Sequence, residues 1–381
     1  MTPRIVANRR QFLSLSAAVA GTAVFTTACG RTQASVGGLS DPFVWSTYGT
    51  GTSTYNDLAA VSDAVASDTG ARVRIITSDT PVGRLAAMRA DIAQAGRLGD
   101  EYFFGYHGVN EFANEDWGPQ DLRMVWAPLS PHSLMVKGGS GIETYADLAG
   151  KRIPRIAANP SVNMKIEGLL AYGGLAPEDV TWVDIGYGDQ PEALKTGKID
   201  TLYQQVYGSP LFELESQMEV AWLPLDPEDT EAVKRLIDLV PTVNVLPFSG
   251  APGQAEGEET HGLVYTLPIS VYAHKSADEV YALVSSMART FPKYEDTTLN
   301  TPRWNPEDVE VMPKLTPFHD GTVRWLTENG MWTPEAEAKN QELIAAGATY
   351  REEWAKYLAT EPKSEEIAEG WPAWIAEKIT G

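Results

Sequence analysis

The fold is decided by a strand, a glycine turn and a helix start, which read Phe43-Val44-Trp45-Ser46-Thr47-Tyr48-Gly49-Thr50-Gly51-Thr52-Ser53-Thr54-Tyr55. The β-branched and aromatic first half predicts a strand over 43–48, and the amphipathic segment that follows predicts a helix over 54–69. The two glycines permit a tight turn that directs free N–H groups and hydroxyls at the space above the helix N-terminus. The stretch therefore predicts an α/β domain with a site for a carboxylate or a similar anion.

Nucleotide-binding loops do not fit this turn. Thr54 occupies the position of the third glycine in G-x-G-x-x-G, and the G-x-x-x-x-G-K-[ST] pattern does not occur in the sequence. A purely structural role stays open, because Thr and Ser hydroxyls at such positions also cap helices.

Short apolar runs alternate with longer amphipathic segments through the rest of the chain, a pattern typical of α/β architecture. We predict two lobes, in which a second lobe over 131–245 is inserted into a first lobe made of 42–130 and 246–381, with helices at the C-terminus. The chain then crosses between the lobes near 128–133 and 245–268. We expect a ligand in the cleft between the lobes, where strands end and helices begin.

Two further turns rich in hydroxyl or amide groups precede predicted helices. One is Thr77-Ser78-Asp79-Thr80-Pro81 in the first lobe, and the other is Asn159-Pro160-Ser161-Val162-Asn163 in the second. Together with the turn at 48–55 they can converge on one small polar ligand.

The charge balance excludes several classes of partner. The 381 residues include 30 Lys plus Arg and 51 Asp plus Glu, a net charge of −21. Such a chain repels phosphate backbones and anionic lipid headgroups, so we predict neither nucleic-acid binding nor a polybasic membrane contact. The single cysteine, Cys29, excludes an intramolecular disulfide and a multi-cysteine metal site.

The N-terminal segment is predicted to be an export signal. An uncharged stretch over 12–28 follows a basic start and is too short and weakly apolar to span a bilayer. The hexapeptide at 8–13 resembles the twin-arginine signal, which exports folded proteins. The charged side chains before residue 31 are Arg4, Arg9 and Arg10.

The end of this segment, Thr26-Thr27-Ala28-Cys29-Gly30, resembles a lipobox, in which cleavage leaves a lipid-bearing N-terminal cysteine. We therefore predict an export signal over 1–28, lipid attachment at Cys29 and a tether over 29–41, with an unmodified Cys29 as the alternative. Removal of the signal leaves 27 basic residues against the 51 acidic ones, a net charge of −24. The expected location is the periplasm or the outer face of the cytoplasmic membrane.

Enzymatic motifs are missing from the sequence. The five His residues show no metal-binding spacing, and Gly138-Gly139-Ser140-Gly141-Ile142 lacks the final glycine of a G-x-S-x-G nucleophile turn. We predict no enzyme, no cofactor and no metal.

Several motifs occur in the order typical of one family. The first is the turn Gly49-Thr50-Gly51 with Tyr55, and the second is the turn and helix over 78–91. The third is Ser140-Gly141-Ile142-Glu143-Thr144-Tyr145-Ala146-Asp147-Leu148-Ala149-Gly150-Lys151-Arg152-Ile153. The fourth is Ala193-Leu194-Lys195-Thr196-Gly197-Lys198-Ile199-Asp200, and a weaker fifth is Glu328-Asn329-Gly330. Over most of the mature chain this set resembles the TAXI family of solute-binding proteins, which serve tripartite ATP-independent periplasmic (TRAP) transporters. The resemblance implies a two-lobed type II periplasmic-binding-protein fold with two crossover strands.

Three segments depart from the family pattern. The first turn is usually richer in glycine but here holds Thr52-Ser53-Thr54; the second-lobe turn, usually Gly-Ser-Gly-Thr, is here 159–163; and the usual Gln-x-Asp after the second helix is here Gly96-Arg97-Leu98. The pocket is therefore expected to be chemically altered. Arg97 is expected to pair bidentately with a carboxylate or sulfonate, unless it is a surface loop residue.

The resemblance implies capture of a small organic anion (carboxylate, dicarboxylate or glutamate-like amino acid) by lobe closure and its delivery to TRAP membrane permease subunits. The alternatives are an exported enzyme with a bound cofactor, or a binding protein that feeds a receptor or another transporter class. The candidate ligand-binding residues are Tyr48, Thr50, Thr52, Ser53, Thr54, Tyr55, Ser78, Asp79, Arg97, Ser161, Asn163, Lys165, Gln204 and Tyr207.

Overall fold

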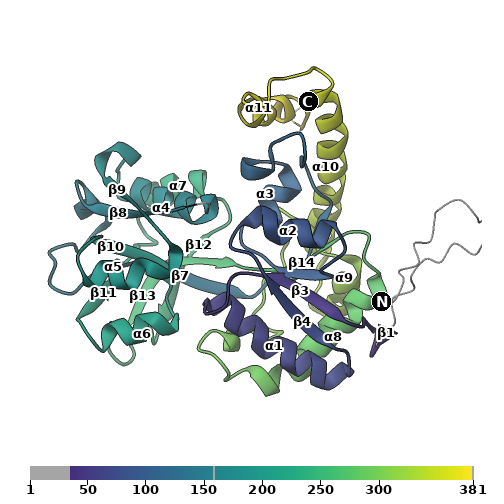
Figure 1. Cartoon of the computed structure of the whole chain (residues 1–381), viewed down its shortest axis with the longest axis horizontal. Coiled ribbons are helices and arrows are strands. Elements are labelled where there is room, and N and C mark those ends of the chain that lie inside the picture. Colours follow the sequence, from purple (N-terminus) through teal and green to yellow (C-terminus); the bar gives the residue numbers. More distant parts are fainter. Residues whose placement is uncertain (1–34, 158, 380–381) are drawn as a thin grey trace, which may run out of the picture. The chain divides into compact units, whose positions relative to one another are not determined.

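The computed structural model describes residues 35–157 and 159–379. Within this part of the chain the β-sheets define two α/β lobes (Figure 1). The export signal predicted over 1–28 and the lipid attachment predicted at Cys29 lie outside the described residues. No helix in the described ranges is long and apolar enough to cross a membrane.

The first lobe is built on a five-stranded sheet with the order β4-β3-β5-β14-β6. β3 pairs in parallel with β4 and β5, and β14 runs antiparallel between β5 and β6. The carboxyl ends of β3, β4 and β5 therefore meet at one edge, where the polar turns follow. The strands are β3 (Phe43–Thr47), β4 (Val73–Thr77), β5 (Ala95–Arg97), β6 (Leu122–Trp126) and β14 (Ile269–Tyr272).

Helices cover both faces of this sheet. They are α1 (Ser53–Thr69), α2 (Pro81–Arg89), α3 (Glu101–His107), α8 (Ala277–Tyr294), α9 (Asp320–Glu328), α10 (Pro334–Leu358) and α11 (Ile367–Ile379), with short 3-10 turns η1 (Asn110–Phe112) and η5 (Thr301–Trp304). Phe43 and Trp45 pack with α1, α8 and α9, whereas Val44 between them packs with α2 and α3. This alternation is expected for a strand that is buried on both faces.

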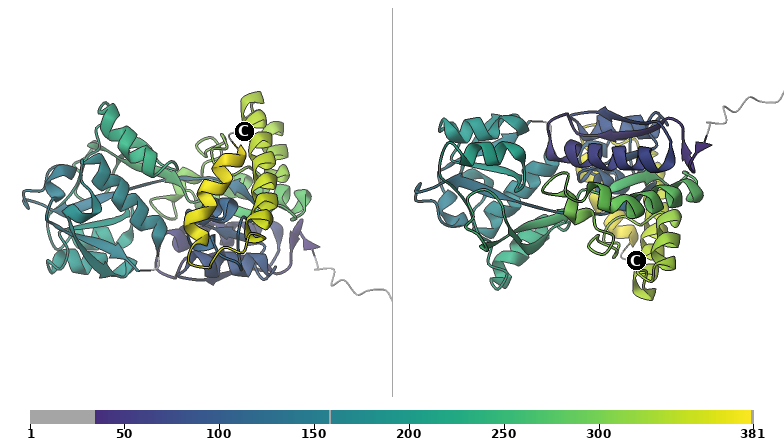
Figure 2. Two further views of the ribbon diagram at one scale, coloured as in Figure 1. Left: turned by 90° about the horizontal axis from the view of Figure 1, so that it is seen from above. Right: turned by 90° about the horizontal axis from the view of Figure 1, so that it is seen from below.

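The C-terminal helices pack on the α3 side of the first lobe. Figure 2 shows α10 and α11 side by side. The Tyr106 hydroxyl of α3 donates to the carbonyl of Leu343 in α10, and the Trp371 indole of α11 donates to the carbonyl of His107 at 2.9 Å. Both contacts fix α3 from its outer side.

The segment before the first lobe differs from the predicted tether over 29–41. β1 (Ser35–Val36) and β2 (Leu39–Ser40) form a small antiparallel hairpin. Ser40 donates its backbone N–H and its hydroxyl to Glu279 of α8 at 2.7 and 2.6 Å, and Leu39 is fully buried. Residues 35–40 are therefore part of the folded lobe, because Leu39 gives the hairpin an apolar anchor.

The second lobe has a mixed architecture. Its main sheet has the order β10-β7-β13-β12, β11 also pairs with β7, and β8 and β9 form a separate parallel pair. The strands are β7 (Leu129–Lys137), β8 (Arg152–Ile156), β9 (Thr181–Ile185), β10 (Thr201–Gln205), β11 (Val220–Trp222), β12 (Asn244–Ser249) and β13 (Glu259–Thr266). The helices are α4 (Pro160–Tyr172), α5 (Gln190–Lys195), α6 (Ser209–Glu215) and α7 (Thr230–Leu239), with 3-10 turns η2 (Tyr145–Leu148), η3 (Pro177–Asp179) and η4 (Tyr187–Asp189).

Two paired strands carry the chain between the lobes. β7 starts three residues after β6 ends, and β13 leads into β14 through Leu267 and Pro268. The register pairs Leu129 with Thr266 and His132 with Leu263. The return crossing thus lies at residues 266–269, and β12 and β13 belong to the second-lobe sheet, although the sequence placed that lobe's end at 245.

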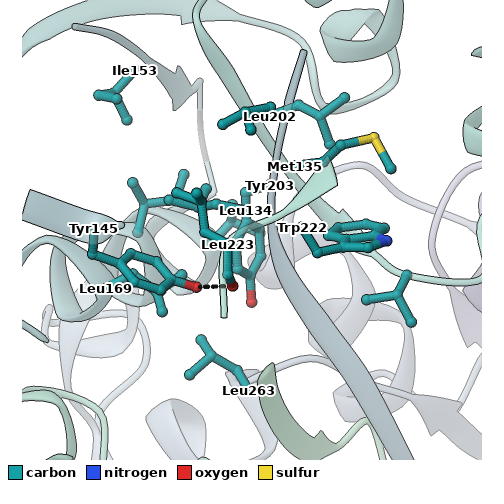
Figure 3. Packing of buried hydrophobic residues seen from close by; sticks show 14 of the residues in the cluster. Leu134, Met135, Tyr145, Ile153, Leu169, Leu202, Tyr203, Trp222, Leu223 and Leu263 are labelled. Atoms are coloured by element: carbon teal, nitrogen blue, oxygen red, sulfur yellow. Dashed lines mark hydrogen bonds between the residues drawn. The ribbon is translucent and has the colours of Figure 1, made fainter. Parts of the chain in front are cut away.

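The core of the second lobe surrounds β7 and β10. Leu134, Leu202 and Leu263 are fully buried, and the Tyr145 hydroxyl donates to the carbonyl of Leu223 at 3.0 Å (Figure 3). The close packing makes the lobe sensitive to lost side-chain volume.

Replacing Leu202 by alanine is expected to lower the free energy of unfolding by about 3 kcal/mol, because the change leaves a cavity among fully buried side chains. The matched control is Leu246→Ala in β12, whose side chain is 40 % exposed. It should lower stability by less than about 1 kcal/mol. Urea unfolding followed by tryptophan fluorescence measures both, and equal losses would contradict the assignment of Leu202 to the core.

Candidate functional site

The turn after β3 has the conformation that its glycines allow. Gly51 has a φ of +89°, a region that favours glycine. The Thr52 hydroxyl accepts from the Tyr55 N–H at 3.1 Å and donates to the carbonyl of Gly49 at 2.9 Å. Thr52 therefore caps α1, the structural alternative considered for this turn. Thr50 is exposed, and Ser53, Thr54 and Tyr55 are half-buried.

The turn after β4 also caps its helix. Thr80 accepts from the Gly83 N–H at 3.1 Å, and the Ser78 hydroxyl accepts from the Thr80 N–H at 3.3 Å. Asp79 lies beside the first turn, because a Cβ on Gly49 would stand 2.9 Å from its Oδ1. The two predicted turns of the first lobe are thus neighbours.

Arg97 is fully buried at the end of β5, so the alternative of a surface loop residue is wrong. Its Nη1 donates to Asp57 Oδ2 at 2.9 Å and to the carbonyl of Thr54 at 3.1 Å, and its guanidinium lies 4.5 Å from the ring centre of Trp304. Asp57 balances its charge before any ligand arrives. Arg97 Nε and Nη2 have no hydrogen-bond partner among the described residues. Its role toward a ligand stays a prediction.

Three predicted residues of the second lobe already have partners within the protein. Asn163 accepts from the Ile156 N–H at 2.8 Å and donates back to the Ile156 carbonyl at 2.9 Å. Gln204 Nε2 donates to the carbonyl of Tyr187 at 3.0 Å. The Tyr207 hydroxyl donates to the carbonyl of Ser249 at 2.8 Å and accepts from Arg303 Nη2 at 2.9 Å. These three side chains are therefore already engaged within the protein, and the bond between Arg303 and Tyr207 joins the first lobe to the second.

Lys165 links the two lobes. From α4 its Nζ donates to Asp100 Oδ2 in the first lobe and to the Ser161 hydroxyl at 3.2 Å, and it lies 4.4 Å from the ring centre of Tyr265. Lys165 and Asp100 are both fully buried, and Asp100 Oδ1 has no partner in the described part of the chain. The structure thus brings together two predicted residues, Ser161 and Lys165, and one acid that the sequence reasoning missed.

A buried charged group continues from Asp100 into the first lobe. Arg84 Nε donates to Glu101 Oε1 at 2.5 Å, Arg84 Nη1 donates to the carbonyl of Ser78 at 2.9 Å, and its guanidinium lies 3.8 Å from the ring centre of Tyr48. Glu101 Oε2 has no partner among the described residues, nor has either carboxylate oxygen of Glu111. The sequence alone did not predict this group. The Gln-x-Asp motif usual in the family was aligned with residues 96–98, and the first acid of the group, Asp100, stands two residues after that segment.

Aromatic side chains lie beside the inter-lobe ion pair. The His132 ring stacks on Tyr203 and Tyr265 at centroid distances of 5.8 and 4.5 Å, and the two tyrosine hydroxyls are 3.0 Å apart. Burial lowers the pKa of His132 to about 3, so this ring stays neutral. The charged groups at this contact between the lobes are therefore Lys165 and Asp100, and His132 adds no charge to them.

A pocket opens where the lobes approach each other. It is lined by Ser53 and Asp57 of α1, Gln205 and Tyr207 after β10, and the loop over 296–302. Two predicted residues, Ser53 and Tyr207, therefore line one pocket from opposite lobes. Across residues 35–157 and 159–379 no group of three or more His, Cys, Asp or Glu is placed to hold a metal ion.

Comparison with known proteins identifies the family. The model of the NMT1-like family matches residues 46–330, and the protein belongs to this family. No curated protein matches the sequence.

Similar solved structures have low sequence identity. The alkanesulfonate-binding protein SsuA from Xanthomonas axonopodis pv. citri, bound to MOPS, is 18 % identical, with 80 % of this chain and 84 % of that chain covered and a TM-score of 0.41. The ligand-binding component of an ABC-type import system from Staphylococcus aureus is 8 % identical, with 77 % and 94 % covered and a TM-score of 0.45. A periplasmic binding protein from Brucella ovis with glutathione bound is 9 % identical, with 64 % and 66 % covered and a TM-score of 0.40.

The two five-stranded sheets, with helices packed around them, confirm the predicted α/β class. All three of these neighbours are named as binding proteins or as a ligand-binding component.

Glu111 is expected to make stability depend on pH. Burial, followed by the nearby carboxylates of Glu101 and Asp100, raises its pKa from 4.5 to about 7, although its own backbone N–H and Arg84 oppose this. Between pH 4.5 and 7 the folded protein keeps a proton that the unfolded chain has lost. The free energy of unfolding therefore falls as pH rises through this window, by up to about 3 kcal/mol from this group.

The variant Glu111→Gln should lack this contribution. Urea unfolding at pH 4.5 and pH 8 should show that wild type loses about 3 kcal/mol more than the variant over this range. Replacing the exposed Glu365 by glutamine is the control and should leave the wild-type dependence unchanged. Identical pH profiles for wild type and Glu111→Gln would show that Glu111 titrates normally.

Proposed function

We propose that the protein is an extracytoplasmic solute-binding protein that captures a small organic acid, including amino acids, between its lobes and delivers it to a TRAP transporter. One observation carries the proposal: polar side chains of both lobes meet across the cleft and keep hydrogen-bonding capacity unused. Lys165 and Ser161 approach from α4, Asp100 approaches from the start of α3, and Asp100 Oδ1 has no partner among the described residues.

Lobe closure is the mechanism that this arrangement supports. The lobes are connected through the paired strands β7 and β13, which can bend while each sheet stays intact. Opening separates Lys165 from Asp100 and exposes both to water, which stabilises separated charges. A bound solute favours the closed state, because it supplies partners for groups that closure buries.

Delivery to a TRAP transporter follows from the resemblance of the motifs at 49–55, 140–153 and 193–200 to the TAXI family. Lipid attachment at Cys29 would keep the protein near the membrane, and it stays a prediction. Solute uptake in cells that express the protein with its neighbouring membrane subunits tests the transporter class. Uptake driven by an ion gradient supports a TRAP transporter, and uptake that requires ATP hydrolysis would contradict it.

The purified protein is expected to carry or accept a small molecule. Native mass spectrometry should find a bound solute, and partial unfolding in urea followed by dialysis should remove it. The stripped protein should melt a few degrees lower, because a ligand at one hundred times its Kd stabilises the folded state by about 2.7 kcal/mol. Adding the solute back should restore the melting temperature. If no solute co-purifies and a broad panel of organic acids and amino acids leaves the melting temperature unchanged, the proposed function fails.

A further inference from the structure

A chain of buried hydrogen bonds runs beside the first crossover strand. It links five side chains that are at most 4 % exposed. In order they are Arg97, Asp57, Asn300, Ser130 and Gln205. They come from five separate segments: the end of β5, α1, the loop before η5, the start of β7 and the end of β10. The chain therefore connects the two lobes through the interior of the protein.

Asp57 anchors this chain in the first lobe. Its Oδ2 accepts from Arg97 Nη1 at 2.9 Å and from Asn300 Nδ2 at 2.7 Å, and its Oδ1 accepts from the Thr298 hydroxyl at 2.6 Å. Both carboxylate oxygens are used, and Arg97 balances the charge. Three donors from different directions hold a buried carboxylate in one orientation. The loop that carries Thr298 and Asn300 is therefore fixed to α1.

Ser130 carries the chain from the first lobe to the crossover. Its hydroxyl donates to Asn300 Oδ1 at 3.3 Å and accepts from Gln205 Nε2 at 2.7 Å. Ser130 stands four residues after Trp126, the last residue of β6, and so short a segment spans at most about 14 Å. Rotation of the second lobe therefore displaces Ser130 less than the residues further along β7.

The crossover at Ser130 is only two strands wide. Residues 129–130 pair with residues 265–266, whereas β10 begins to pair with β7 at His132 and β12 begins to pair with β13 at Val264. Two-stranded ribbons twist more than wider sheets do. A side-chain bond beside the ribbon adds a third point of attachment, which opposes twisting more than it opposes bending.

We infer that the chain from Asp57 through Asn300 and Ser130 to Gln205 is a hinge brace, which holds the two-stranded crossover to the first lobe and limits the motion of the second lobe to bending. The inference deepens the proposed function, because it names the residues that guide lobe closure. Without the brace the lobes sample more orientations, and a smaller share of these brings the two sides of the cleft together. A solute then finds fewer binding-competent molecules, and its apparent affinity falls.

Two serines of β7 provide a matched test, because both are fully buried. Ser130→Ala removes the hydroxyl that joins Asn300 to Gln205. Ser133→Ala is the control, because the Ser133 hydroxyl bonds Tyr145 and a backbone carbonyl within the second lobe. Both variants lose one buried hydroxyl from the same strand, and they differ in whether that hydroxyl reaches the first lobe.

Amide hydrogen exchange measures the stiffness of the crossover. In ligand-stripped protein, Ser130→Ala should speed exchange of the backbone amides at 129–130 and 265–266 by about fivefold or more, the effect of one lost buried hydrogen bond. Ser133→Ala should leave exchange at these amides unchanged. Equal exchange there in wild type and Ser130→Ala overturns the brace.

Spin labels measure the range of lobe orientations. Glu231→Cys in α7 and Ala348→Cys in α10 place the labels at exposed positions of the two lobes, and Cys29→Ser removes the single native cysteine. Pulsed electron paramagnetic resonance without added solute should give a broader distance distribution for Ser130→Ala than for wild type or Ser133→Ala. Equal widths in wild type and Ser130→Ala, or equal broadening in Ser133→Ala, overturn the brace. Because no solute enters the measurement, either result leaves the proposed function standing.

A second matched pair approaches the brace from the first lobe, and it carries the test if Ser130→Ala does not fold. Asn300 and Asn340 are 2 % and 1 % exposed, and Asn340 accepts from the Phe318 N–H at 2.7 Å within the first lobe. Asn300→Ala should broaden the distance distribution, and Asn340→Ala should lower stability without broadening it. Broadening by both variants would show that general loosening of the first lobe is the cause, and would contradict the brace.

Discussion

The ion pair between Lys165 and Asp100 is the interaction on which the cleft depends. It joins α4 of the second lobe to the start of α3 in the first, and both side chains are fully buried. Removing one partner of such a pair costs about 3 to 5 kcal/mol, because the other charge stays behind in a low-dielectric environment. Closure and charge pairing are therefore one event, and whatever enters the cleft must fit the charges that closure brings together.

Local patterns in the sequence were sufficient to predict the architecture. The strand and turn over 43–55, the alternation of strands and helices and the two crossings all follow from periodicity and turn residues, which act over short distances. The hairpin over 35–40 was missed because a four-residue strand pair with one apolar anchor, Leu39, has no periodicity. The exact end of the second lobe depends on which sheet β12 and β13 join, and such pairing is not a local property.

The candidate site could be predicted only in part. Ser161 and Lys165 were named because they stand at a helix start, and the structure places both at the inter-lobe contact. Arg97 was named for its charge, but its burial beside Asp57 depends on a partner 40 positions away in the sequence. Asp100, Glu101 and Glu111 carry no distinctive motif. Their importance comes from burial and from unused oxygens, which only the three-dimensional arrangement reveals.

The attachment of α10 and α11 to the outer side of α3 has a mechanical consequence. Tyr106 and His107 tie α3 to these helices, and Gly347 of α10 leaves room for the Tyr106 ring. The acids at the start of α3 are thereby mounted on a stiff support, and α4 is held in its own lobe by α7 and β8 while Met164 and Lys165 reach the first lobe. The two sides of the cleft therefore behave as rigid blocks. When the lobes part, the acids stay with α3 and Lys165 leaves with α4, so bending should be concentrated in the strands that connect the lobes.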